Sequence, residues 1–202
     1  MSEPNAVAAT TDEIKPGLWH WQIHDERIDF LSSSHALRVD DGTVLLDPLP
    51  LAPDALAALG EVTAICLTTS SHQRSSWRLR RELGVPVYAP ALTKQAEEDP
   101  DVHYSEGDRL PGNLLAIFTP GAGTTQHTLL VEDAGVVFAP DLFARPPGAA
   151  LMMTPAQYMH DPDEARRSAE KLLDYEFDVL CHGHGAPVVG GAKNAIRSAL
   201  AG

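Results

Sequence analysis

The most constraining feature of this sequence is a strand–loop–helix–strand unit in its first half. Residues 62–67 form a fully apolar run, which is typical of a strand buried on both faces of its sheet. Residues 75–83 have helical spacing and are followed by Gly84, a common helix C-cap, and residues 85–88 begin another strand. Because strands joined through a helix usually pair in parallel, the unit predicts an α/β protein.

Short strands and turns alternate along the rest of the chain, without a repeat or a low-complexity block. Further strands are predicted at residues 17–23, 35–40, 43–46, 102–104, 108–110, 114–118, 127–132, 135–139 and 178–181. Further helices are predicted at residues 53–59, 161–173 and 193–200. Both halves are rich in strands and end in helices, so the pattern indicates mixed sheets flanked by helices.

Size and composition narrow the class of protein. A chain of 202 residues can build one good-sized core, and we expect a single domain over residues 14–202 after a disordered tail, residues 1–13. The net charge of −13 argues against nucleic acid or an anionic membrane surface as a partner. The sequence has no apolar run of the ~20 residues that a membrane span needs and no secretory signal. Cys66 and Cys181 lie in apolar runs, which favours reduced thiols in a cytoplasmic protein.

Four segments carry the residues that suggest a chemistry. In chain order they are Leu67-Thr-Thr-Ser-Ser-His72-Gln-Arg-Ser-Ser76, Thr119-Pro-Gly-Ala122-Gly123, Ala139-Pro-Asp141-Leu-Phe143 and Cys181-His182-Gly-His184-Gly185. Their order and context resemble the metal-binding segments of the metallo-β-lactamase superfamily, which also holds glyoxalase II and many lactonases. The resemblance covers about residues 14–190 and implies a four-layer αβ/βα sandwich.

The first segment follows an apolar strand, at the point where the family has Thr-His-x-His-x-Asp-His. Two alignments are open. Without a gap, every ligand is lost, and the motif positions fall on Thr69, Ser71, Gln73 and Arg74. With a two-residue deletion, Ser71 and His72 overlay the Asp-His end of the motif. We prefer the second alignment, because it keeps a histidine where the family has one and starts the following helix at the right place.

The other segments keep part of the family's ligand set. Ala122 stands where Thr-Pro-Gly-His-Thr has its ligand histidine. Asp141 stands at the carboxylate that bridges two metals in the family, and His184 at the histidine of the closing Gly-His-Gly. Asp47, which ends an apolar strand, resembles an aspartate that supports the metal loops through hydrogen bonds.

The surviving residues match the ligands of one metal. The resemblance implies that one of the family's two sites is lost and that His72, Asp141 and His184 remain at the other, with Ser71 in place of its aspartate. We expect Asp47 and Ser71 in supporting positions around these ligands. Two histidines and one carboxylate can hold one divalent ion, such as zinc, iron or manganese, with open positions for water. Two expectations stay open, one metal or none.

Two functions follow from these two expectations. With a metal, the resemblance implies a hydrolase of esters, thioesters or lactones, in which Asp141 orients the attacking water. Without one, the chain is a catalytically inactive scaffold whose cleft binds a small-molecule ligand or a protein partner. Hydrolysis of β-lactams is not implied, because a fold does not fix a substrate.

Several other residues outside the four segments, or next to their proposed ligands, also lead to predictions. Four arginines are expected on a solvated helix face, with an anionic substrate as the alternative: Arg74, Arg78, Arg80 and Arg81. His35 is expected as a solvent-exposed strand residue and His127 as a strand residue. Three roles remain open for residues 145–154: a lid, a contact in a homo-oligomer or a plain surface loop. A redox role for Cys181 beside His182 rests on two residues alone.

Overall fold

The structure, a computed structural model, describes residues 3–91, 93 and 97–202. In this part of the chain a seven-stranded sheet follows the chain order from β1 to β7. Its strands are β1 (Asp12–Lys15), β2 (Leu18–Asp25), β3 (Phe30–Val39), β4 (Gly42–Leu46), β5 (Val62–Cys66), β6 (Val87–Pro90) and β7 (Val102–Tyr104). The first four strands pair antiparallel, and β4 to β7 pair in parallel, as the strand–helix–strand unit predicts.

A second sheet of six strands has the order β16-β14-β11-β10-β9-β8 over the described residues. Its strands are β8 (Arg109–Leu110), β9 (Leu114–Phe118), β10 (His127–Val131), β11 (Val136–Phe138), β14 (Val179–Cys181) and β16 (Val188–Val189). A small third sheet joins β13 (Met152–Met153), β12 (Phe143–Arg145) and β15 (His184–Gly185). A 3-10 helix spans Ala156–Tyr158.

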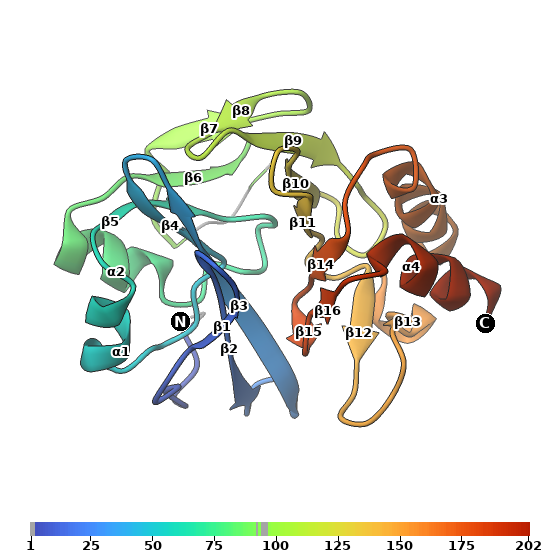
Figure 1. Ribbon diagram of the computed structural model, residues 1–202, viewed down its shortest axis with the longest axis horizontal. Helices are drawn as coiled ribbons and strands as arrows, with labels where there is room; N and C mark the ends of the chain where they lie inside the picture. The colour runs from blue at the N-terminus through green and yellow to red at the C-terminus, as the bar shows by residue number, and fades with distance from the viewer. Residues whose placement is uncertain (1–2, 92, 94–96) are drawn as a thin grey trace.

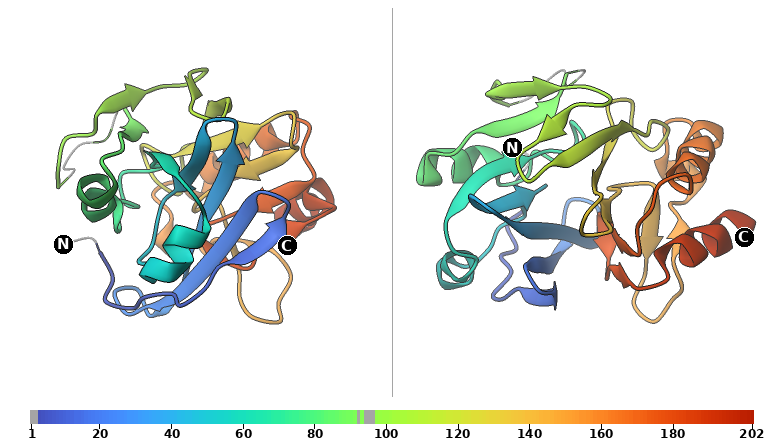
Figure 2. Two further views of the ribbon diagram at one scale, coloured as in Figure 1. Left: turned by 60° about the vertical axis from the view of Figure 1, so that its left-hand side comes forward. Right: turned by 45° about the horizontal axis from the view of Figure 1, so that its top comes forward.

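Two pairs of helices cover the outer faces of the sheets. The helices α1 (Pro53–Ala58) and α2 (Ser76–Leu83) lie against the first sheet, and α3 (Pro162–Leu172) and α4 (Ala192–Ala201) against the second (Figure 1). The right-hand view of Figure 2 keeps the two pairs on opposite sides of the molecule. None of the helices in the described ranges is long and apolar enough to cross a membrane.

The apolar core has three parts, which match these layers. Residues such as Leu46 and Phe138 fill the space between the two sheets. Ile65 and Trp77 pack the first sheet against its helices, and Leu180 and Ile196 do the same for the second. The protein is therefore the four-layer αβ/βα sandwich that the sequence predicts.

Local signals in the sequence explain where several elements end. Gly84 ends α2 in the left-handed region with φ of 69°, a conformation that costs glycine little. The Asp161 side chain accepts a hydrogen bond from the backbone N–H of Glu164 and so caps the start of α3. Asp40 and Asp41 form the two-residue turn between β3 and β4.

The N-terminal segment differs from the predicted disordered tail. The backbone N–H of Ala8 donates to Pro50 O, and Ala52 N–H donates to Ala8 O. Ala8 is buried, and β1 already begins at Asp12. Residues 1 and 2 of the predicted tail lie outside the described residues. The prediction is wrong for the segment around Ala8, because contacts with the loop before α1 hold this polar stretch in place.

Strand β3 also differs from its prediction, since it begins at Phe30 instead of residue 35. Ser32, Ser33 and Ser34 interrupt the apolar pattern, yet all three are buried. Ser33 Oγ donates to Gly185 O, and Ser34 Oγ donates to Asp47 O. These hydroxyls are satisfied by segments far away in the sequence, and hydropathy patterns do not show such partners.

Candidate metal centre

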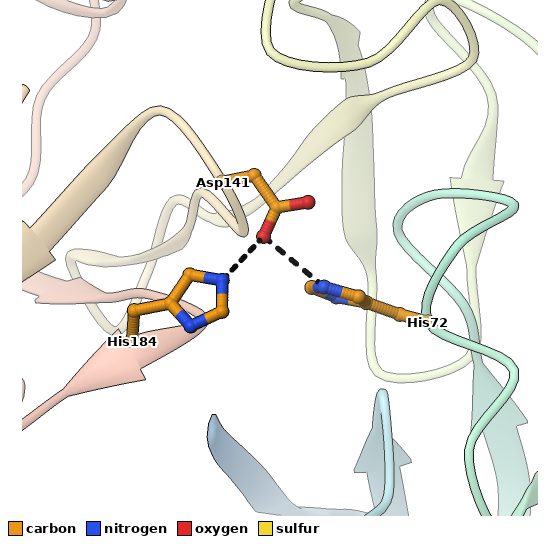
Figure 3. Close-up of side chains that lie close together, drawn as sticks. All are labelled: His72, Asp141 and His184. Atoms are coloured by element: carbon orange, nitrogen blue, oxygen red, sulfur yellow. Dashed lines mark ion pairs between the residues drawn. The ribbon is translucent and has the colours of Figure 1, made fainter. Parts of the chain in front are cut away.

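Three side chains from separate loops converge where strands of both sheets end. His72 lies in the loop after β5, Asp141 in the turn after β11, and His184 at the start of β15 (Figure 3). Each offers one nitrogen or oxygen atom, and these three atoms lie within 4.8 Å of one another. The structure thus brings together the three residues that the sequence analysis selected as metal ligands.

His72 is held in one orientation by two carboxylates. Its Nδ1 lies 2.9 Å from Asp47 Oδ2, and its Nε2 lies 3.1 Å from Asp141 Oδ1. An ionised carboxylate only accepts hydrogen bonds, so Nδ1 carries the proton that Asp47 accepts. In the neutral imidazole, the lone pair on Nε2 then faces Asp141.

His184 repeats this arrangement with a backbone partner. Its Nδ1 donates to the carbonyl oxygen of Leu31 at 2.9 Å, because a carbonyl can only accept. Its Nε2 lies 3.3 Å from the same atom of Asp141, Oδ1. Fixing Nδ1 as the donor is the usual way in which proteins prepare Nε2 of a histidine as a metal ligand.

The Asp141 carboxylate lies between the two imidazoles. Its Oδ1 is buried and has no hydrogen bond of regular geometry from any described residue. Burial alone would raise the pKa of Asp141, but the neighbouring His72 and His184 imidazoles hold that pKa well below its usual range. Burial and the charge of Arg74 oppose protonation of His72, yet Asp141 and Asp47 raise the pKa of its imidazole. The centre therefore attracts positive charge.

The geometry fits one divalent ion. Bonds of about 2.0–2.2 Å to a tetrahedral ion place its donor atoms about 3.3–3.6 Å apart. The separations from Asp141 Oδ1 to the two histidine nitrogens, 3.1 and 3.3 Å, are close to that range, and all three donor atoms lie within 4.8 Å of one another. Two imidazole lone pairs and an oxygen with no hydrogen-bond donor point toward one volume, and three protein ligands leave a position open for water or substrate.

Gly183 lets the ligand loops approach one another. A Cβ atom at this position would lie 2.8 Å from Pro140 O, 3.0 Å from Asp141 Oδ1 and 3.2 Å from His72 Cε1. The backbone N–H of Gly183 instead donates to Pro140 O at 2.6 Å. Only a residue without a side chain fits between these segments.

Asp47 lies behind His72 and connects several segments. Its Oδ1 accepts from the backbone N–H of Thr68 at 2.8 Å, and its Oδ2 accepts from the Thr68 hydroxyl and from His72. The residue has a left-handed backbone with φ of 47°. The structure therefore places Asp47 where a residue that supports the metal loops is expected.

Four hydroxyl groups lie together beside His72, in the loop after β5 and just before β10. Thr69 Oγ1 lies 3.3 Å from Ser71 Oγ and 3.5 Å from Thr125 Oγ1, and Thr125 Oγ1 donates to Ser70 Oγ at 3.0 Å. We call Thr69, Ser70, Ser71 and Thr125 the hydroxyl cluster. Ser71, expected to support the ligands, has its described side-chain contact within this cluster. Ala122 packs against the apolar core beside the second sheet.

Arg74 is the residue that the sequence analysis placed wrongly. It was expected on a solvated helix face, but it is 3% exposed and precedes α2 with a left-handed φ of 44°. Its Nη2 lies 3.3 Å from His72 Nε2. The expectation suits Arg78, Arg80 and Arg81 better, because these residues on α2 pair with acidic side chains near the surface. Arg74 lies two residues after His72 and before the start of α2. This position in the sequence was the available signal that Arg74 belongs to the centre and not to the helix face.

Two other histidines have different outcomes. His35 is 4% exposed, so its predicted exposure is wrong. Its ring lies 5.2 Å from that of His20 and 5.7 Å from that of Phe138, between the two sheets. His127 lies on β10, as predicted, and its Nδ1 donates to Thr125 O.

A groove of about 360 Å³ lies on the Leu31 side of His184, and His184 itself is not one of its lining residues. Leu31, whose carbonyl holds the His184 ring, lines this groove, and so does Ala186. Its other walls are Gln22 and the segment from Arg145 to Ala149. The first part of the predicted 145–154 loop therefore borders a space large enough for a small molecule.

The layered sandwich and the histidine–aspartate cluster at its strand ends define a fold class and a candidate metal site. A family model of the metallo-β-lactamase superfamily matches residues 12–198. The chain belongs to this superfamily. No curated protein matches the chain at a significant level.

Solved structures with the same fold include several metallo-β-lactamases. One from Pontibacter korlensis is 16% identical with a TM-score of 0.74, covering 95% of this chain and 98% of that chain. The enzyme FIM-1 from Pseudomonas aeruginosa, in a mono-zinc form, is 17% identical with a TM-score of 0.70, covering 100% and 98%. TTHA1623, in a di-iron-bound form, is 23% identical with a TM-score of 0.61, covering 78% and 89%. At these identities the likeness shows the fold alone.

Proposed function

We propose that this protein is a hydrolase of esters, thioesters or lactones that uses one divalent metal held by His72, Asp141 and His184. The observation that carries this proposal is the orientation of the two histidines. Asp47 and Leu31 O fix both Nδ1 atoms as donors, and both Nε2 atoms face Asp141 Oδ1. A purely structural pair of histidines would have no need to share one carboxylate oxygen in this way.

The residues of the chain have separate tasks in this proposal. His72, Asp141 and His184 hold the ion, and Asp47 keeps the His72 ring in place. The chemistry that a bound divalent ion supplies is Lewis-acid chemistry, which makes water more acidic and polarises a carbonyl group. Asp141, as an ionised carboxylate, orients the water that attacks the substrate.

The groove beside His184 supports a small substrate. Leu31, Pro146, Pro147 and Ala186 supply apolar walls, while Gln22 and Arg145 supply polar groups. A small acyl compound fits such a lining better than a polymer does. The net charge of −13 disfavours nucleic acid and membrane surfaces as partners. We place the reaction in the cytoplasm, a choice supported by two buried and unpaired thiols.

Elemental analysis of the untagged protein tests the proposal. After loading with zinc, iron or manganese and removal of free metal, we expect about one ion per chain, and none in His184→Ala. His103→Ala is the matched control, because His103 is an exposed histidine on β7. Ester, thioester and lactone substrates then test hydrolysis by the loaded protein. The proposal fails if the wild type holds no metal, or if His184→Ala holds as much as the wild type.

A catalytically inactive scaffold is the competing function. The hydroxyl cluster supports it, because one half of the family's binuclear site has lost its ligands. In that case the groove beside His184 binds a small ligand without chemistry. Absence of bound metal, together with ligand binding that survives His184→Ala, would favour the scaffold.

A further inference from the structure

The guanidinium of Arg74 is buried beside the candidate metal centre. Among the described residues, its Nη1 donates to Ser33 O at 2.7 Å, Asp47 O at 3.0 Å and Ser34 Oγ at 3.2 Å. These hydrogen-bond acceptors are neutral, and the carboxylates of Asp47 and Asp141 act on the guanidinium through their charge. Its Nη2 is directed at His72 Nε2. A full positive charge therefore stands next to a proposed ligand atom.

The two neighbours of His72 Nε2 require opposite protonation states of this nitrogen. Arg74 Nη2, a donor at 3.3 Å, needs a lone pair on this nitrogen. Asp141 Oδ1, an acceptor at 3.1 Å, needs a proton on it. The nitrogen has one position in the ring plane, which holds either a lone pair or a proton. Coordination of a metal would consume the same lone pair, so Arg74 and the metal compete for one atom.

The positive charge of Arg74 also weakens the binding of a metal. Asp141 and Asp47 bring two negative charges to the centre, and Arg74 returns one positive charge at hydrogen-bond distance from His72. The guanidinium is always protonated under ordinary conditions and lies where water screens it little. Repulsion between this charge and a divalent ion in the centre weakens binding.

We propose that Arg74 sets the metal affinity of this centre. The guanidinium acts as a built-in cation that lowers the affinity of the centre for a divalent ion. This inference rests on the proposed function, since it requires that a metal binds at His72, Asp141 and His184. Arg74 is a positioning residue in this view, because it acts on the metal through His72.

Metal dissociation constants of three variants test the inference. Zinc and cobalt affinities are measured by competition with a chromophoric chelator, on untagged protein whose fold is checked by circular dichroism. Arg74→Gln removes the charge, and we expect its zinc to be bound about tenfold more tightly or better. Arg74→Lys keeps the charge and stays near the wild type. Arg78→Gln is the matched control, because Arg78 carries the same charge on α2, where it pairs with Glu82 and Glu3.

The outcomes separate this inference from the proposed function. Tighter binding by Arg74→Gln alone supports the inference. Equal or weaker binding by Arg74→Gln overturns it and leaves the proposed function intact. No metal in the wild type or in Arg74→Gln overturns both.

A second measurement uses only the wild type, in case Arg74→Gln does not fold. In a crystal structure of the zinc-loaded protein, Arg74 Nη2 should move beyond hydrogen-bond distance of His72 Nε2. An Arg74 that still donates to this nitrogen while zinc is bound would overturn the inference.

Discussion

The loop after β5 contributes to two neighbouring regions with different chemistry. On one side, His72 meets Asp141 and His184 around one volume. On the other side lies the hydroxyl cluster, whose members form hydrogen bonds with one another. Both regions are built on the same strand ends, so the sandwich tolerates either. The comparison teaches that the fold supplies positions, whereas a few side chains decide whether a position can bind a metal.

The largest expected effect comes from removing a ligand. Asp141→Asn replaces the charged oxygen between the two histidines, so we expect the bound metal to fall from about one ion per chain to none. Hydrolytic activity is lost with it. Elemental analysis and an ester assay measure both effects, and His103→Ala serves as the control. Full metal content in Asp141→Asn would break the distinction between the two regions.

A smaller loss is expected from Asp47→Asn. The amide no longer carries the charge that holds the His72 ring, so metal affinity should fall about 10–100-fold. Chelator competition measures this change, and thermal unfolding separates it from loss of the fold. An unchanged affinity would mean that the hydrogen bond to His72 does not prepare the ligand.

The buried histidines between the sheets predict a dependence of stability on pH. Burial lowers the pKa of His20 to about 4, against a weaker opposite effect of Asp12, and holds the pKa of His35 well below its usual range. The unfolded chain, with pKa values near 6.5, then binds more protons than the folded protein. Stability is therefore complete above pH 6.5 and declines as the pH falls toward 4, by about 3 kcal/mol for His20.

Urea unfolding at pH 7.5 and pH 5 measures this dependence. The two conditions bracket the unfolded-state pKa of histidine, about 6.5. The variant His20→Gln should show a smaller difference between the two conditions than the wild type does. The exposed variant His103→Ala should show the same difference as the wild type. A pH dependence unchanged in His20→Gln would exclude this residue as its source.

The smallest effect is expected in the hydroxyl cluster. Thr69→Val and Ser71→Ala each remove a hydrogen bond worth about 0.5–1.5 kcal/mol, and neither side chain is a proposed ligand. Metal content should stay at its wild-type value, with a small decrease in the unfolding midpoint. Loss of metal in either variant would show that the cluster takes part in binding.

Much of the fold was predictable because its signals are local. The apolar run of β5, the helical spacing of α2 and the left-handed Gly84 each depend on a few neighbouring residues. The convergence of His72, Asp141 and His184 was predictable only through the family resemblance, since they lie far apart in the chain.

The predictions that were wrong share a different cause. Arg74 is buried because the backbone oxygens of Ser33 and Asp47 accept hydrogen bonds from its guanidinium. The position of β3 depends on the hydrogen bond from Ser33 Oγ to Gly185 O. His35 is buried because the second sheet covers β3 with Phe138. Each of these outcomes needs two segments to meet in space. A pattern read along one segment contains no information about the other.

The missing side chain at Gly183 has a consequence for the size of the centre. The backbone N–H of Gly183 contacts Pro140 O, so main-chain contact sets the distance between the turn that carries Asp141 and the segment that carries His184. Main-chain contacts are hard to stretch. Asp141 and His184 are therefore carried by two main-chain segments whose separation changes little.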